Sequence, residues 1–190
     1  MSENKQFIIR GIVIGNNRVG REHLLQRLCN GMFITCCFGS SVEDKFHKYL
    51  KFEDKIFDVM LLKMYTGDTP KFIQELCIKQ SNFYIIAYAI NDSESLENVW
   101  KYREDIYEVL KLDDHEEIPL ILCATKLDLE RNVSSHEEIK MMKKCGTTLF
   151  YTSAKNNIGV QEMGYGCVAN YFKILKKKEK ENNKRLCLVM

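Results

Sequence analysis

Residues 84–90 read Tyr84-Ile85-Ile86-Ala87-Tyr88-Ala89-Ile90, an apolar run without interruption. A strand that is apolar at every position is typical of the centre of a parallel sheet, where helices cover both faces. The polar side chains of Asn91-Asp92-Ser93 come next and favour the start of a helix. The helix expected over residues 95–111 carries an apolar stripe along one side. This strand and helix together indicate an α/β fold.

The same alternation of strand, loop and helix continues in both directions along the chain. Further strands are expected over residues 8–14, 48–52, 57–64, 120–124 and 148–151. Further helices are expected after Gly20, after the capping box at residues 134–137, and from Gln161 onward. We therefore predict a six-stranded, mostly parallel sheet with helices on both faces. Ligands of such sheets bind at the carboxyl ends of the strands, where every loop described below falls.

Length and composition favour one domain. The chain has 190 residues, of which 45% are apolar and 28% charged, an ordinary balance for a soluble protein. A net charge of +2 is too small to indicate nucleic-acid binding. The first residues lack the apolar run of a signal peptide, and the 8 cysteines show no zinc spacing. We predict a domain over residues 1–172 and a basic tail over residues 173–190.

The loop after the first expected strand has the spacing of a P-loop. Gly15 and Gly20 stand five positions apart, and the backbone amides between them would wrap a phosphate at a helix N-terminus. A P-loop continues with Lys and then Ser or Thr, whereas this chain has Arg21 and Glu22. Arg21 keeps the positive charge, and Glu22 replaces the hydroxyl that holds Mg²⁺ with a carboxylate that can itself ligate the ion. An ordinary strand–helix turn is the alternative. The candidate phosphate-binding residues are Asn17, Arg18, Val19, Gly20, Arg21 and Glu22.

Two polar segments follow the last two expected strands. Thr125-Lys126-Leu127-Asp128 and Thr152-Ser153-Ala154-Lys155 resemble the guanine-recognising loops of Ras-type small GTPases. Each could be an ordinary polar loop, but both together, in this order, favour the resemblance, which covers residues 7–172 and implies a Ras-like G domain.

The resemblance implies a role for most residues of these two segments. Asp128 would accept two hydrogen bonds from guanine, the stem of Lys126 would cover the base, and the Ala154 amide would meet guanine O6. Thr125 replaces an asparagine, and its shorter side chain is expected to weaken the bracing of the loop. Ser153 and Lys155 complete the second segment, so we expect GTP and GDP as ligands.

The two segments that resemble the Ras switches depart further from the family pattern. In residues 38–44, Ser41 falls near the threonine that senses Mg²⁺ and the γ-phosphate. In residues 64–68, the Gly67 amide could meet the γ-phosphate, while Met64 replaces the aspartate that anchors Mg²⁺. Asp68 replaces the glutamine that orients the attacking water, and its negative charge opposes hydrolysis. Glu22 and Ser41 are the remaining candidates for metal ligands, and we expect weak or absent hydrolysis.

The last residues given, Cys187-Leu188-Val189-Met190, fit a prenylation signal, with a farnesyl group on Cys187. One lipid chain binds a membrane only marginally, so a second signal is needed. A cluster of basic residues supplies it, at about 1 kcal/mol for each residue near an anionic surface. The cluster consists of Lys173, Lys176, Lys177, Lys178, Lys180, Lys184 and Arg185. We expect attachment to the cytoplasmic face of the plasma membrane.

These observations predict a lipid-anchored, GTP-binding signalling switch that contacts effector proteins through its switch segments. Two alternatives remain open. The chain could be a nucleotide-free pseudo-GTPase, which uses the fold as a membrane-tethered scaffold. It could also be an ordinary GTPase in which Glu22 or Asp68 ligates Mg²⁺.

Overall fold

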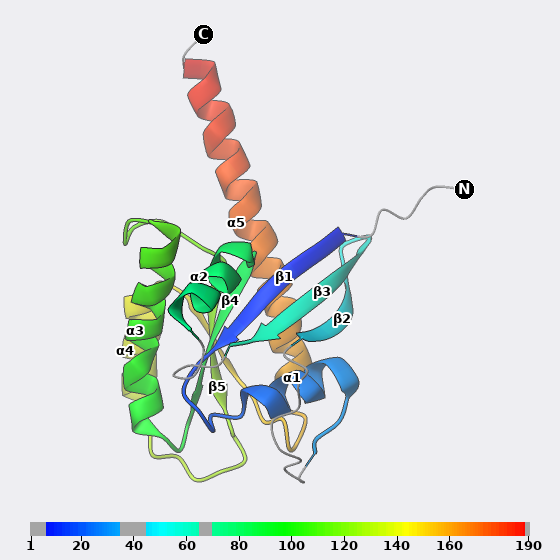
Figure 1. The fold of residues 1–190 in the computed structure, drawn as a ribbon, viewed down its shortest axis with the longest axis vertical. Helices are drawn as coiled ribbons and strands as arrows, with labels where there is room; N and C mark the ends of the chain where they lie inside the picture. The colour runs from blue at the N-terminus through cyan, green and yellow to red at the C-terminus, as the bar shows by residue number, and fades with distance from the viewer. Residues whose placement is uncertain (1–6, 35–44, 65–69, 189–190) are drawn as a thin grey trace, which may run out of the picture.

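The computed structural model describes residues 7–34, 45–64 and 70–188. The strands within these ranges are β1 (Phe7–Ile14), β2 (Lys45–Phe52), β3 (Lys55–Lys63), β4 (Phe83–Ala89), β5 (Leu120–Thr125) and β6 (Thr148–Tyr151). They form one sheet in the order β2-β3-β1-β4-β5-β6 (Figure 1). Every neighbouring pair is parallel except β2 and β3, which are antiparallel. The prediction of a six-stranded, mostly parallel sheet is confirmed.

Helices cover both faces of this sheet, as predicted. The described ranges contain α1 (Arg21–Asn30), α2 (Lys71–Gln80), α3 (Ser93–Leu110), α4 (Ser135–Cys145) and α5 (Val160–Leu188). One apolar cluster joins the sheet to α1 and α5, and a second joins it to α2, α3 and α4. The central strand β4 contributes alternate side chains to the two clusters. Its residues are all buried for that reason.

The helix α2 was not predicted from the sequence. Only Ile78 of this helix is buried, while the apolar side chains of Phe72 and Leu76 are exposed. An apolar stripe is the main signal of an amphipathic helix, and exposed apolar residues obscure its period. The strand β2 also begins three residues earlier than the predicted residue 48.

The last helix, α5, runs without a break across the predicted boundary at residues 172 and 173. Its first half packs on the sheet through Met163, Cys167 and Val168, and its second half projects beyond the sheet (Figure 1). Ile174 is the last buried residue whose side chain is described. The division into a domain and a basic tail therefore falls inside one helix and stays a prediction. Among the described residues, no helix has both the length and the apolar character needed to cross a membrane.

Candidate nucleotide site

The loop between β1 and α1 lies at the carboxyl edge of the sheet and has a tightly turned backbone. A Cβ atom on Gly15 would come within 2.2 Å of the carbonyl oxygen of Ala87, so only glycine fits there. Gly20, which precedes α1, has a φ of 90°. Arg18 adopts the same left-handed region with a φ of 64°, although it carries a side chain. The loop thus keeps the backbone shape of a phosphate-binding turn at the start of a helix.

Arg21, in the place of the P-loop lysine, connects this loop to the end of β3. Its buried guanidinium donates hydrogen bonds to the carbonyl oxygen of Met64 and, at 3.3 Å, to Oδ1 of Asn17. The Met64 amide in turn donates to the Val13 carbonyl at 3.1 Å. The guanidinium is therefore held by the end of β3 and by the phosphate loop at the same time. A lysine has no planar fork with which to make these two contacts.

Glu22 forms an ion pair that sequence reasoning missed. The ammonium of Lys63, the last residue of β3, lies 3.0 Å from Oε2 of Glu22. The Lys63 side chain is 4% exposed, whereas that of Glu22 is 39% exposed. A signal was present in the sequence, because Phe57, Val59 and Leu61 define the inward face of β3 and Lys63 continues it. A lysine at an inward position of a strand indicates a partner of opposite charge.

The described residues do not fit the usual Mg²⁺ site. Mg²⁺ prefers oxygen ligands in a near-octahedral shell. Met64 offers a thioether instead, and its side chain is buried in the apolar cluster beneath α2 and α3. The Glu22 carboxylate already binds an ammonium. Within residues 7–34, 45–64 and 70–188, no group of three or more His, Cys, Asp or Glu side chains could hold a metal. Ser41, Gly67 and Asp68 lie outside the described residues.

A cavity of about 340 Å³ brings together the two segments predicted to read the base. It lies beside the start of α1, against Gly20 of the phosphate loop. Its lining is Gly20, His23, Leu24, Phe33, Thr125, Lys126, Asp128, Leu129, Thr152, Ala154 and Lys155. A pocket of this kind, mostly apolar with a few polar groups that fix orientation, suits a planar heterocyclic base.

Asp128 is held in place by a residue of the second segment. The fully buried Ser153 donates its hydroxyl to Oδ1 of Asp128 at 2.6 Å and accepts a hydrogen bond from the Asn156 amide at 3.0 Å. Ser153 does not line the cavity. It therefore acts as a positioning residue, while Asp128 borders the cavity itself.

Thr125 and Lys126 join the base cavity to the phosphate loop. The Thr125 hydroxyl lies 2.5 Å from the Val19 carbonyl and 2.9 Å from the Tyr88 carbonyl. Although a threonine was expected to brace the loop less well than an asparagine, this hydroxyl still reaches the phosphate loop. Lys126 has a φ of 60°, and its stem would lie 3.9 Å from a Cβ atom placed on Gly20. The stem of Lys126 thus runs beside the phosphate loop.

Two further residues of the site were missed by the sequence analysis. Arg27 of α1 donates to the Ala154 carbonyl at 2.7 Å and to the Lys155 carbonyl at 3.4 Å, which fixes the second segment against α1. Phe33 lines the cavity, and its ring centroid lies 5.1 Å from that of His23. Neither residue belongs to a local motif. Only the tertiary fold brings them to the cavity.

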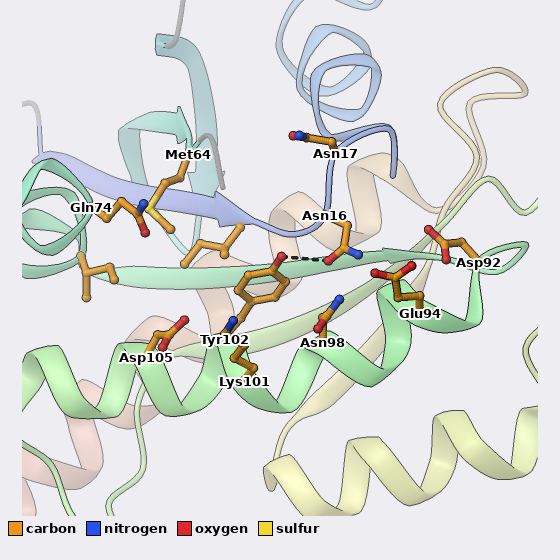
Figure 2. Close-up of a pocket in the computed structure, with 12 residues that line it drawn as sticks. Asn16, Asn17, Met64, Gln74, Asp92, Glu94, Asn98, Lys101, Tyr102 and Asp105 are labelled. Atoms are coloured by element: carbon orange, nitrogen blue, oxygen red, sulfur yellow. Dashed lines mark hydrogen bonds between the residues drawn. The ribbon is translucent and has the colours of Figure 1, made fainter. Parts of the chain in front are cut away.

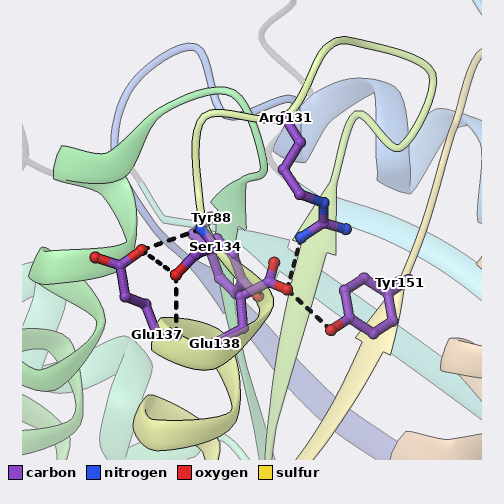
Figure 3. A network of polar contacts seen from close by, with 6 residues as sticks. All are labelled: Tyr88, Arg131, Ser134, Glu137, Glu138 and Tyr151. Carbon is purple, nitrogen blue, oxygen red and sulfur yellow. Dashed lines mark hydrogen bonds and ion pairs between the residues drawn. The ribbon is translucent and has the colours of Figure 1, made fainter.

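A buried carboxylate ties β4, α4 and β6 together. Glu138 of α4, which is 1% exposed, accepts hydrogen bonds from Tyr88 at 3.0 Å and Tyr151 at 2.9 Å (Figure 3). It also pairs with Arg131, which follows the first base-reading segment, at 2.6 Å. Burial, with the negative charge of Glu138, raises the pKa of Tyr88, so the phenol stays a donor. The network joins β4, α4 and β6 to the loop that carries Asp128.

The other cavity beside the phosphate loop is larger, at about 580 Å³, and lies between α2 and α3 (Figure 2). Tyr102 of α3 reaches across it and donates to Oδ1 of Asn16 at 2.8 Å. Its acidic lining includes Asp92, Glu94 and Asp105, against one lysine, Lys101. Three carboxylates would repel a polyphosphate. The acidic cavity therefore disfavours a bound nucleotide, whose phosphates are negatively charged, and the smaller cavity is the better candidate for the base.

A turned glycine loop at a helix N-terminus, next to a cavity that a fixed aspartate borders, is the arrangement expected of a P-loop protein that binds a nucleotide. Residues 10–173 match the family model described as "Ras family", and the chain belongs to that family. It is also similar to "Ras-like protein rasV" of Dictyostelium discoideum, with 24% identity over 201 residues, which cover 96% of this chain and 86% of the relative. Membership of the Ras family implies binding of guanine nucleotides.

Proposed function

We propose that the chain is a guanine-nucleotide-dependent signalling switch with weak or absent GTP hydrolysis, attached to the cytoplasmic face of the plasma membrane. The observation that carries the proposal is the base cavity in which Ser153 holds the Asp128 carboxylate. A carboxylate can accept two hydrogen bonds from the N1 and exocyclic N–H groups of guanine, whereas adenine offers no such pair.

The nucleotide preference tests this proposal directly. Extraction and mass analysis of material that co-purifies with the protein should identify GDP or GTP, and titration should favour GDP over ADP. Asp128→Asn should weaken GDP binding by about a hundredfold, because it removes charge-assisted hydrogen bonds. The same variant should gain affinity for xanthosine diphosphate, since the asparagine amide can donate to the xanthine 2-carbonyl. Asp54→Asn, at the exposed turn between β2 and β3, is the matched control.

Slow hydrolysis is supported by the residues at the phosphate end of the site. The Met64 side chain supplies no oxygen ligand to a metal, and Glu22, in the place of the metal-binding hydroxyl, already pairs with Lys63. Single-turnover phosphate release from GTP should therefore be much slower than in a Ras protein measured in parallel, with or without Mg²⁺. Mg²⁺-dependent release at the rate of that reference protein would instead support an ordinary GTPase with Glu22 or Asp68 as metal ligand.

The exposed residues 175–181 of α5 support membrane attachment. Lys176 pairs with Glu53 at 2.9 Å and Lys177 with Glu117 at 2.7 Å. Exposed ion pairs of this kind contribute only about 0–1 kcal/mol, so an anionic bilayer can compete for these lysines. Cys187→Ser should move the protein from the membrane fraction to the soluble fraction and abolish incorporation of a farnesyl label. Cys29→Ser is the control, because Cys29 lies in α1 and is not part of the prenylation signal.

The alternative function is a nucleotide-free scaffold on the membrane. The observation that favours it is the position of Arg21, whose guanidinium bonds to the Met64 carbonyl and the Asn17 side chain. Protein that carries no nucleotide and ignores guanosine phosphates in titration would support the scaffold. In either function we propose that effector proteins contact the segments around Ser41 and Gly67.

A further inference from the structure

We propose that the ion pair between Glu22 and Lys63 takes the place of Mg²⁺ in this protein, so that guanine nucleotide binds without a divalent cation. This inference rests on the nucleotide binding proposed above and concerns the phosphate end of the same site.

The pair lies where the two usual metal anchors of the family would meet. Glu22 is the second residue of α1 and stands at the position of the metal-binding hydroxyl. Lys63 is the last residue of β3, directly before Met64, which stands at the position of the metal-anchoring aspartate. Lys63 is also in register with Val13 of β1, two residues before the phosphate loop begins at Gly15. The ammonium thus lies at the edge of the sheet that faces the expected phosphates.

The burial of the Lys63 side chain shows that this pair differs from an ion pair between two exposed side chains. The Lys63 side chain is 4% exposed, so its charge has lost most of its water and needs a counter-charge. Glu22 provides that counter-charge at 3.0 Å. Among the described residues, the pair between Lys79 and Glu75 on α2 has half-exposed side chains at 3.7 Å, the ordinary surface arrangement.

The chemistry of the pair removes the repulsion between Glu22 and the phosphates that a metal would otherwise have to balance. Without a partner, the Glu22 carboxylate would repel a polyphosphate, and Lys63 neutralises that charge. A lysine ammonium is also a compact positive charge with three N–H donors, which suits phosphate oxygens. A Mg²⁺ ion on the same carboxylate would stand beside this fixed positive charge, which opposes its binding. Arg21, buried next to Glu22 in the chain, adds a second permanent positive charge.

The experiment measures GDP binding to the full chain, with Mg²⁺ and with EDTA. In the wild-type protein, removal of Mg²⁺ should change the dissociation constant by less than about threefold. In Lys63→Met, whose side chain is one atom shorter and uncharged, EDTA should weaken binding by about tenfold or more, because the Glu22 carboxylate then loses the Lys63 ammonium. Lys79→Met is the matched control and should behave like the wild type.

A second variant tests the same point from the opposite direction. Glu22→Ser combined with Lys63→Leu and Met64→Asp restores a hydroxyl and a carboxylate for the metal. GDP binding to this triple variant should become Mg²⁺-dependent, with a loss of about tenfold or more in EDTA. If wild-type protein binds GDP only with Mg²⁺, the inference is overturned while the proposed function stands. If it binds guanine nucleotide under neither condition, both are overturned.

Discussion

Ser153 donates its hydroxyl to Oδ1 of Asp128 at 2.6 Å, and this bond joins the two segments that border the base cavity. Each segment follows its own strand, β5 or β6, and these strands are neighbours in the sheet. Asp128 can read a base only if its carboxylate is held at the correct angle. We therefore expect the specificity of the cavity to depend on a residue that does not itself line it.

Ser153→Ala should weaken the binding of GDP by about tenfold, because a hydrogen bond to a charged group contributes about 1.5–3 kcal/mol. The Asp128 carboxylate remains in this variant, so the preference for GDP over ADP should narrow without disappearing. Isothermal titration with both nucleotides measures the two effects. Ser135→Ala, at the exposed start of α4, is the control. Unchanged GDP affinity in Ser153→Ala would contradict the positioning role.

Thr125→Val should lower both the stability of the fold and the affinity for nucleotide. The variant keeps the shape of the side chain and removes the buried hydroxyl that contacts the Val19 and Tyr88 carbonyls. Leaving buried acceptors without a donor costs about 1–3 kcal/mol. Urea unfolding, followed by the fluorescence of the single tryptophan, Trp100, measures the loss of stability. Thr125→Ser keeps the hydroxyl and should lose less stability and less affinity than Thr125→Val, whereas equal losses would show that the methyl group contributes as much as the hydroxyl.

The sheet and most helices could be predicted from the sequence because their apolar patterns are strong. The uninterrupted run at residues 84–90 predicted β4, and the capping box at Ser134 and Glu137 predicted the start of α4. The helix α2 was missed, since its apolar residues Phe72 and Leu76 face away from the core. Local pattern reveals an element only where that element buries most of its apolar side chains.

That Lys126, Asp128 and Ala154 lie together at one cavity could also be predicted, since they belong to short local segments, and their role in reading the base stays a prediction. Lys63, Arg27 and Phe33 could not be assigned in the same way. They reach the site from β3, from α1 and from the segment after α1, and their partners are far away in the chain. The structure of the segments around Ser41 and Gly67 lies outside the described residues, so their predicted roles stay predictions.

Glu138→Ala should destabilise the protein by about 2–3 kcal/mol. The substitution leaves the buried Tyr88 hydroxyl without its acceptor, and an unsatisfied buried group costs about 1–3 kcal/mol. Arg131 also loses its partner, but its side chain is about one-third exposed, so water replaces much of that interaction. Urea unfolding measures the change, and Glu138→Gln, which keeps acceptor oxygen for one tyrosine, should lose less.

The loss of stability in Glu138→Ala should be smaller when the Tyr88 hydroxyl has already been removed. In a double-mutant cycle with Tyr88→Phe, the two effects should not add, because both variants break the same hydrogen bond. Glu137→Ala combined with Tyr88→Phe is the control and should be additive, because Glu137 bonds to Ser134 and Tyr88 bonds to Glu138. Strict additivity of Glu138→Ala and Tyr88→Phe would show that the network has no energetic coupling.

The start of α4 predicts a dependence of stability on pH. The Ser134 hydroxyl and backbone amide both donate to Glu137, at 2.6 Å and 3.0 Å, and these hydrogen bonds lower the pKa of Glu137 from the ordinary value of 4.5. Since the folded pKa is the lower one, the carboxylate stabilises the folded state above pH 4.5. This contribution is lost as the pH falls through the folded pKa.

Two variants separate the contribution of the Glu137 charge from the contribution of its hydrogen bonds to Ser134. Ser134→Ala should cost about 1 kcal/mol at neutral pH, as expected for loss of an N-cap, and less in acid, where Glu137 is protonated. Glu137→Gln can still bond to the Ser134 amide but cannot titrate, so its difference from the wild type should vanish as the pH falls below 4.5. Urea unfolding at a series of pH values provides the measurement. A difference between Glu137→Gln and the wild type that stays constant through this range would mean that the capping box stabilises α4 by shape alone, and that the charge of Glu137 contributes nothing.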